Sequence, residues 1–214
     1  MNKQVCAIGI IIVLAVAVGV VFLLGMDPSG GDPPFDNEGR YDMTIFDDMG
    51  VLYANQSDIA HWNNGYSESD ACPWGAEHNG LDYMFYNNSP VIAASPGLVI
   101  DIELRYLPNT TIYVVGVQIR FNDSVWMSYG FEGDGNETLR AQQAAMLEVE
   151  VGDWVEKGEQ IGRFLRPTEF DHIHFGVYVN EEAVCPRSVM GVDDYDDIMI
   201  LVHSFHPTWD LCYP

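Results

Sequence analysis

The sequence has little positive charge. Only 9 of its 214 residues are Lys or Arg, against 32 Asp or Glu, and the formal net charge at pH 7 is −23. Proteins that bind nucleic acid neutralise phosphates with clustered Lys and Arg, so nucleic acid is excluded as a partner. A surface this acidic stays hydrated, and it disfavours strongly anionic substrates unless a metal ion captures them. The composition does not indicate an oligomeric state.

Cysteine is also scarce. Of the 4 cysteines, Cys6 lies inside an apolar N-terminal run and three lie beyond it. An extracellular setting permits disulfides, and there Cys185 and Cys212 could tie the C-terminal extension to the rest of the domain. Cys72 would then be left over as a buried residue, a free thiol or a zinc ligand. It is also an alternative disulfide partner.

Long apolar runs are limited to residues 5–26, which contain no charged side chain. A run of this length matches a membrane span and exceeds the core of a typical signal peptide. No Ala-x-Ala-like cleavage site follows it, which favours residues 1–26 as a transmembrane anchor over a removed signal segment. Because Lys3 precedes the run, we expect a cytoplasmic N-terminus and a single-pass protein with its remaining chain on the extracellular face. If the segment is cleaved, the protein is secreted.

The chain beyond the apolar run divides into a linker and one domain. Residues 27–40 are rich in Pro, Gly and Asp, which is typical of a linker. No repeat follows, so residues 41–214 are expected to form one β domain with a C-terminal extension. An excess of Asn-x-Ser/Thr sequences indicates a glycosylated external surface, or a chance enrichment. These sequences begin at Asn55, Asn87, Asn109, Asn122 and Asn136.

Short apolar runs separated by Gly and Pro dominate the second half of the chain, and they indicate strands joined by tight turns. The expected strands lie at 90–104 (with a turn at Pro96-Gly97), 110–121 and 125–131. Residues 147–162 are expected to form short strands with turns at Gly152-Asp153 and Lys157-Gly158, and the expected helices lie at 138–146 and 194–203. The pattern predicts an all-β fold, an antiparallel β-sandwich or half-barrel, with an N-terminal transmembrane helix.

Three histidines and one aspartate are the candidates for metal chemistry. Ile173 and its apolar neighbours alternate with His172 and His174 in the period-two pattern of a half-buried strand, so both imidazoles share one face. His78 and Asp82 add one imidazole and one carboxylate. Two imidazoles and a carboxylate suit catalytic zinc, which keeps a fourth position open for water. The remaining imidazole would act on that water, so the pattern predicts metal-assisted hydrolysis, although a lone His is more often structural.

Four stretches then occur in a characteristic order: His78–Asp82, Val91–Val99, Val151–Gly162 and His172–Phe175. Together they resemble the lysostaphin/LytM-type zinc metallopeptidases, which cleave peptide cross-links in bacterial cell walls. The first stretch is similar to the family's His-x-Gly-x-Asp motif and the last to its His-x-His motif. The resemblance covers about residues 74–186, and it implies a barrel-sandwich hybrid fold with a duplicated hybrid motif.

The resemblance implies a role for each candidate side chain. His78, Asp82 and His174 would hold Zn²⁺, and His172 would act beside the water as a base or a transition-state donor. The implied function is a membrane-anchored extracellular zinc metallopeptidase that uses a zinc-activated water to hydrolyse peptide bonds of envelope or extracellular peptides.

One position departs from the family pattern. The family carries a second catalytic His in a Tyr-x-His motif, and Phe131 stands at that position here. Loss of such a donor costs on the order of 10²–10³ in rate. Glu132 could substitute as a proton carrier, but its side chain should leave the opposite face of the strand from Phe131. The alternative function is therefore a metal-binding but catalytically weak relative that binds envelope polymer or regulates another hydrolase.

The hairpins are also similar to those of biotinyl/lipoyl carrier domains. Such a carrier needs a Lys at an exposed hairpin tip between its two halves. No Lys occurs between Lys3 and Lys157, and Lys157 belongs to the second turn itself. The hairpins therefore support the fold class and not a carrier function.

Overall fold

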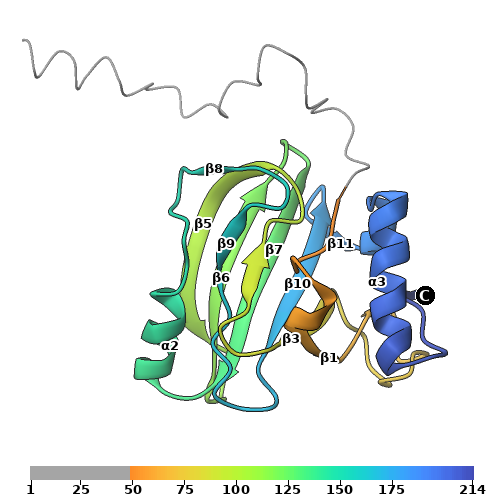
Figure 1. The fold of residues 1–214 in the computed structure, drawn as a ribbon, viewed down its shortest axis with the longest axis horizontal. Helices are drawn as coiled ribbons and strands as arrows, with labels where there is room; N and C mark the ends of the chain where they lie inside the picture. The colour runs from red at the N-terminus through yellow and green to blue at the C-terminus, as the bar shows by residue number, and fades with distance from the viewer. Residues whose placement is uncertain (1–48) are drawn as a thin grey trace, which may run out of the picture. The chain divides into compact units, whose positions relative to one another are not determined.

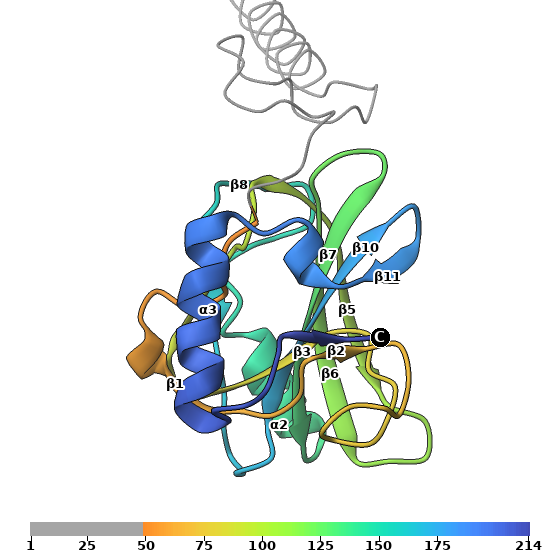
Figure 2. The same cartoon turned by 90° about the vertical axis from the view of Figure 1, so that its right-hand side faces the viewer.

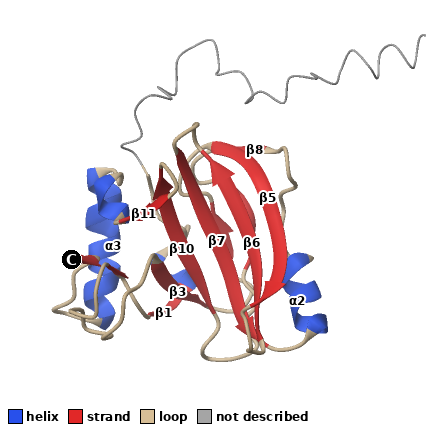
Figure 3. Cartoon of the chain, turned by 180° about the vertical axis from the view of Figure 1, so that it is seen from behind, coloured by secondary structure: helices blue, strands red, loops and turns tan. Residues whose placement is uncertain are grey.

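The computed structural model describes residues 49–214 and is organised around one antiparallel sheet of eight strands. These are β1 (Ile59–Trp62), β3 (Leu81–Phe85), β5 (Gly97–Tyr106), β6 (Ile112–Arg120), β7 (Val125–Asp134), β8 (Trp154–Val155), β10 (His172–Val179) and β11 (Glu182–Val184). The strand order is β1-β3-β10-β7-β6-β5-β8, and β11 pairs with the C-terminal end of β10. The long strands curl into a half-barrel (Figures 1 and 3), as the sequence predicts.

Two short sheets and two α-helices complete the described chain. β4 (Pro90–Ile92) pairs antiparallel with β9 (Gln160–Arg163), and β2 (Tyr66–Ser67) pairs parallel with β12 (Cys212–Tyr213). The helices are α2 (Glu137–Ala144) and α3 (Val192–Phe205), with 3-10 turns η1 (Gln56–Asp58) and η2 (Pro186–Ser188). Both predicted helices are confirmed to within two residues at each end, the usual uncertainty of helix boundaries.

The alternation predicted for β10 is confirmed. Ile173, Phe175 and Val177 are fully buried in the core, and the two histidines between and before them are half-buried on the opposite face. The Phe175 ring packs against Tyr129 of β7, with ring centroids 5.0 Å apart. One face of the sheet therefore packs in the core, and the other face can carry polar side chains.

The helices begin and pack for identifiable reasons. Asn136 caps α2, because its side-chain oxygen accepts hydrogen bonds from the backbone N–H groups of the first turn. α3 buries Ile198, Leu201 and Val202 and lies beside the β1 edge of the sheet (Figures 1 and 2). At the end of α3, His206 Nε2 lies 2.9 Å from the carbonyl oxygen of Trp62 in β1.

Two predictions concern the membrane and the surface. The predicted anchor at 1–26 and linker at 27–40 lie outside the described residues. Within residues 49–214, every helix is too short or too polar to span a bilayer. Of the five Asn-x-Ser/Thr asparagines, four are exposed, and Asn122 is half-buried. Their predicted surface position is thus confirmed for four of the five.

The C-terminal extension is joined to the domain by a disulfide. Cys185 and Cys212, 27 residues apart, form the bridge, and Cys72 is a free, half-buried cysteine. The bridge attaches β12, which follows α3, to the segment that follows β11. Because β12 pairs with Tyr66 and Ser67 of β2, the bridge also secures the chain that leads into β3.

Replacing Cys185 and Cys212 with Ser should lower the free energy of unfolding by about 3–4 kcal/mol, because the unfolded chain gains entropy when this loop is no longer closed. Urea denaturation followed by tryptophan fluorescence measures the loss. The control Cys72→Ser alters a cysteine outside the bridge and should change stability by less than about 1 kcal/mol. Equal losses in the two proteins would contradict this role of the bridge.

Candidate metal centre

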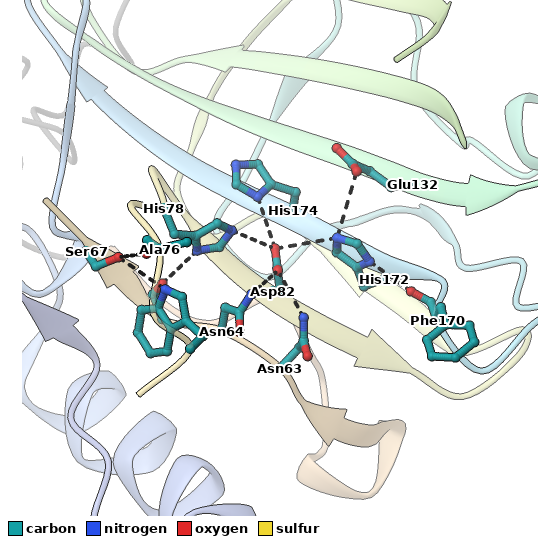
Figure 4. A network of polar contacts seen from close by, with 12 residues as sticks. Asn63, Asn64, Ser67, Ala76, His78, Asp82, Glu132, Phe170, His172 and His174 are labelled. Carbon is teal, nitrogen blue, oxygen red and sulfur yellow. Dashed lines mark hydrogen bonds and ion pairs between the residues drawn. The ribbon is translucent and has the colours of Figure 1, made fainter. Parts of the chain in front are cut away.

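Cross-strand register brings an imidazole and a carboxylate together. His174 of β10 pairs directly with Asp82 of β3, and directly opposed residues of antiparallel strands share one face of the sheet. His172 lies two residues before His174 and therefore points to the same side. Figure 4 shows these three side chains converging above the sheet.

A loop before β3 brings in the second imidazole of the motif. His78 precedes Asp82 by four residues, and its backbone is anchored to β2 by two hydrogen bonds with Ser67. The His78 N–H donates to Ser67 O at 2.9 Å, and the Ser67 N–H donates to His78 O at 2.8 Å. The loop thus continues the pairing of β2 and β12, so the C-terminal extension helps to position His78.

Gly80 explains the glycine in the His-x-Gly-x-Asp motif. A Cβ atom at this position would stand 2.6 Å from the carbonyl oxygen of Phe175 and 2.8 Å from the His174 ring. Both contacts are too short for any side chain, and the first involves backbone that cannot easily move. Only glycine therefore lets the loop run close enough to β10 for His78 to face His174.

Three imidazole nitrogens surround one carboxylate oxygen (Figure 4). Asp82 Oδ1 lies 3.0 Å from His174 Nδ1, 3.2 Å from His78 Nε2 and 3.6 Å from His172 Nε2. Asp82 itself is only 4% exposed. Its other oxygen, Oδ2, accepts hydrogen bonds at 3.4 Å from the side-chain amides of the residues at 63 and 64, both Asn.

Contacts with backbone carbonyl oxygens determine which ring nitrogen of His78 and of His172 keeps its lone pair. His78 Nδ1 lies 2.7 Å from Gly65 O, and His172 Nδ1 lies 3.0 Å from Phe170 O. A carbonyl oxygen only accepts, so in both rings Nδ1 carries the hydrogen and Nε2 is left with a lone pair in the neutral form. That lone pair faces the Asp82 carboxylate, and the contact is favourable only with a proton or a metal ion between them.

The electrostatics of the group favour positive charge. Burial by itself would raise the pKa of Asp82, but hydrogen bonds from His174 and His78 and the charges of His172 and His78 outweigh it and hold the pKa well below its usual value. Burial would lower the pKa of His78, but its hydrogen bond and charge interaction with Asp82 dominate and raise it. The centre is a buried anion that attracts a cation.

The donor set fits zinc. The ligand atoms of His78, Asp82 and His174 lie within 4.8 Å of one another. Zinc–nitrogen and zinc–oxygen bonds of about 2.0–2.2 Å place neighbouring tetrahedral donors about 3.3 Å apart. The separations of 3.2 Å and 3.0 Å from Asp82 Oδ1 to the two imidazoles are close to this value. The contact between His78 Nδ1 and Gly65 O is of the kind that holds an imidazole in the orientation a metal ion needs.

Other candidate residues lie apart from this group. Within residues 49–214, Cys72 is not among the clustered donors, and its sulfur instead contacts the carbonyl oxygen of Ala76 at 3.2 Å. The remaining histidines of residues 49–214 pack around the end of α3: His61 against the rings of Phe205 and His206, and His203 with Nε2 3.0 Å from Trp209 O.

β7 places its residues differently from the expectation based on the family motif. Phe131, at the position of the family histidine, is fully buried, and its ring stacks in the core with Phe164. Glu132 does leave the opposite face of the strand, as predicted, but that face is the one that carries the candidate centre. Glu132 pairs directly with His172, and Glu132 Oε2 lies 3.8 Å from His172 Nε2. The sequence alone could not tell which face of β7 would meet the histidines.

A polar groove of about 290 Å³ adjoins the centre on the same face of the sheet. Its lining includes His174 and Glu132, with Tyr178 of β10 and an ion pair between Glu103 and Arg105 at 2.9 Å. Tyr178 stacks on Trp126, with ring centroids 3.9 Å apart, which holds the tyrosine ring flat beside the groove. The groove gives an extended ligand access to the candidate centre.

The model of Peptidase family M23 matches residues 76–186, a segment that contains His78, Asp82, His172 and His174. No curated protein matches the sequence. The matched segment also contains the long strands β5, β6, β7 and β10 of the sheet.

Several solved structures are similar. A zinc-containing peptidase from Vibrio cholerae is 19% identical with a TM-score of 0.44, over 66% of this chain and 40% of that one. Lysostaphin from Staphylococcus simulans is 20% identical with a TM-score of 0.45, over 66% of this chain and 52% of that one. The catalytic domain of the prophage-encoded M23 protein EnpA from Enterococcus faecalis is 21% identical with a TM-score of 0.44, over 61% and 91%. The chain therefore spans about half or less of the first two proteins.

Replacing Asp82 with Ala should weaken zinc binding by more than about 100-fold, because loss of a ligand should exceed the 10–100-fold effect of losing a group that only hydrogen-bonds to a ligand. Competition with a chelating dye measures the affinity. The matched control is Asp197→Ala, which removes a half-buried carboxylate that accepts a hydrogen bond from Tyr53 on another side of the domain. Unchanged affinity in the Asp82 variant would rule out this metal centre.

Proposed function

Because the chain belongs to peptidase family M23, we propose that its β domain is a zinc endopeptidase that hydrolyses peptide bonds of cell-envelope or extracellular peptides. One observation carries the proposal: three imidazole nitrogens lie within 3.6 Å of a single buried carboxylate oxygen. A structural histidine cluster needs no such convergence, whereas two imidazoles and a carboxylate on the ion, with a further group beside it, form one of the ligand sets that catalytic zinc uses.

His78, Asp82 and His174 are the residues that would hold the ion. Bound there, zinc would act as a Lewis acid, polarising the scissile carbonyl and making water a nucleophile near neutral pH. Asn63 and Asn64 hold the second oxygen of Asp82, so the carboxylate presents Oδ1 alone to the three rings.

His172 is placed to handle protons beside the ion. Its Nδ1–H donates to Phe170 O, which fixes the ring and turns Nε2 toward Asp82 and Glu132. Nε2 can take a proton from water, and once it carries that proton it can donate a hydrogen bond to the carbonyl oxygen as negative charge develops there. His172 is therefore the catalytic residue in this proposal.

The groove indicates the kind of substrate. It runs over the half-barrel beside His174, and Arg105 in its lining is already paired with Glu103. The net charge of −23 repels strongly anionic chains. A neutral or cationic extended peptide, such as a cross-link of an envelope polymer, suits such a groove better than an acidic one.

We also propose that the domain lies outside the cell, joined to the membrane by residues 5–26, with the N-terminus cytoplasmic, or that it is secreted if this segment is cleaved. The disulfide between Cys185 and Cys212 supports an oxidising compartment. The exposed asparagines of the Asn-x-Ser/Thr sequences are accessible for glycosylation, which also fits this location.

A second candidate function is metal binding with little or no catalysis, in a protein that binds envelope polymer or regulates another hydrolase. The observation that favours it is Phe131, which stands at the position of the family's second histidine and is buried. Turnover separates the two functions, because both require the metal.

The full chain, purified in detergent and supplied with one equivalent of zinc, should cleave a glycine-rich or wall-derived peptide. His172→Ala should lower kcat by about 10²–10³ because it removes a group that acts on charge in the transition state, and it should leave zinc content unchanged. Mass spectrometry of the products and metal analysis measure both quantities. His203→Ala, which alters a histidine at the end of α3, should retain wild-type turnover. Zinc uptake with no turnover in the wild type would instead favour the binding function.

A further inference from the structure

Glu132 is a second carboxylate on the face of the sheet that carries the candidate centre. Its register partner across β7 and β10 is His172, and alternation along β7 sends Phe131 into the core and Glu132 toward the centre. Figure 4 shows the Glu132 carboxylate and Asp82 on two sides of His172. The imidazole Nε2 lies 3.6 Å from Asp82 Oδ1 and 3.8 Å from Glu132 Oε2.

The space around this carboxylate is open toward a ligand. Gly130 pairs with His174, and a Cβ atom there would stand 3.5 Å from Glu132 Oε1, so the glycine leaves the floor between Glu132 and His174 free of any side chain. Glu132 lines the groove of about 290 Å³ on one side and a smaller hollow of about 60 Å³ beside His172 on the other. A peptide lying in the groove would therefore pass the carboxylate.

The charged groups around Glu132 leave its carboxylate able to accept a proton. Arg105, the cation of the same groove, is paired with Glu103 at 2.9 Å. Burial, helped by the charge of Asp82, raises the pKa of Glu132 and outweighs the opposing charges of His172, His174 and Arg105. A carboxylate with a raised pKa retains an abstracted proton more readily than an exposed one, which suits a group that accepts and then returns a proton.

We propose that Glu132 is a second catalytic residue, which carries the proton between water and the leaving amine. The proposal rests on the peptidase function above. As the water oxygen bonds to the scissile carbonyl carbon, the Glu132 carboxylate accepts one water proton. As the C–N bond breaks, Glu132 returns that proton to the amine nitrogen, and the carboxylate is restored. When its Nε2 carries a proton, His172 can then donate a hydrogen bond to the carbonyl oxygen. Glu132 on β7 thus supplies the proton-carrying group that Phe131 cannot supply.

The test compares Glu132→Gln with wild type in the full chain loaded with zinc, using the wall-derived peptide. Glutamine keeps the shape of the side chain but cannot accept the proton, so kcat should fall by about 10²–10⁴. KM and zinc affinity should change by less than about threefold. The control Glu182→Gln alters an exposed carboxylate on β11 and should retain wild-type kcat. Wild-type kcat in Glu132→Gln would overturn the proposal.

Two histidine variants distinguish Glu132 from position 131. Glu132→His places another proton carrier on the face of the centre and should restore at least a tenth of wild-type kcat. Phe131→His places the family residue on the core side, so it should lower stability without raising kcat. Higher kcat in Phe131→His would show that residue 131 reaches the substrate, and the assignment of Glu132 would be wrong.

A readout that needs no turnover separates this proposal from the peptidase function. Infrared difference spectra of the zinc-loaded protein with a phosphinate pseudopeptide should show the carbonyl band of one protonated carboxylic acid, and Glu132→Gln should lack it. A wild type that shows the band but cleaves nothing would refute the peptidase function and leave Glu132 as the proton-holding group. Absence of the band in wild type would overturn the role of Glu132, even if the enzyme turns over.

Discussion

The described structure depends on how it accommodates the buried carboxylate of Asp82. An ionised carboxylate buried without partners is costly, and it is retained only when charged or hydrogen-bonding groups surround it. Here three imidazoles face one oxygen and two asparagine amides hold the other. Because the rings of His78 and His172 are turned by backbone carbonyls so that Nε2 faces the carboxylate, the arrangement is complete only with a cation inside it.

Several distant parts of the chain maintain this arrangement. The register between β3 and β10 sets Asp82 against His174, and Gly80 allows the loop that carries His78 to approach β10. The loop is in turn bonded to β2, which pairs with β12, and the disulfide fastens β12 to the segment after β11. The C-terminal extension, which lies largely beyond the matched family segment 76–186, is thereby part of the support of a candidate metal ligand.

The side chain that β7 presents to the candidate centre determines which proton transfers are possible there. With Phe131 in the core, its ring contributes to packing and does not lie on the face of β7 that meets the centre. Glu132 occupies that face, in register with His172. A carboxylate in this place changes the chemistry available to the centre: an imidazole can be neutral or cationic, whereas a carboxylate can accept a proton but cannot hydrogen-bond to an oxyanion unless it is protonated.

Local patterns in the sequence were sufficient for the strands at 97–106, 112–120 and 125–134, for both helices, and for the four side chains that converge on the centre, because alternation, capping and short motifs are encoded by neighbouring residues. The pairing of Cys185 with Cys212 was one of the options that the sequence left open. Tertiary structure alone decided that Gly65 and Phe170 orient the rings, and that Glu132, not residue 131, faces His172. The physical reason is register: a shift of one residue between β7 and β10 would exchange the two faces, and only packing of the whole core selects one register.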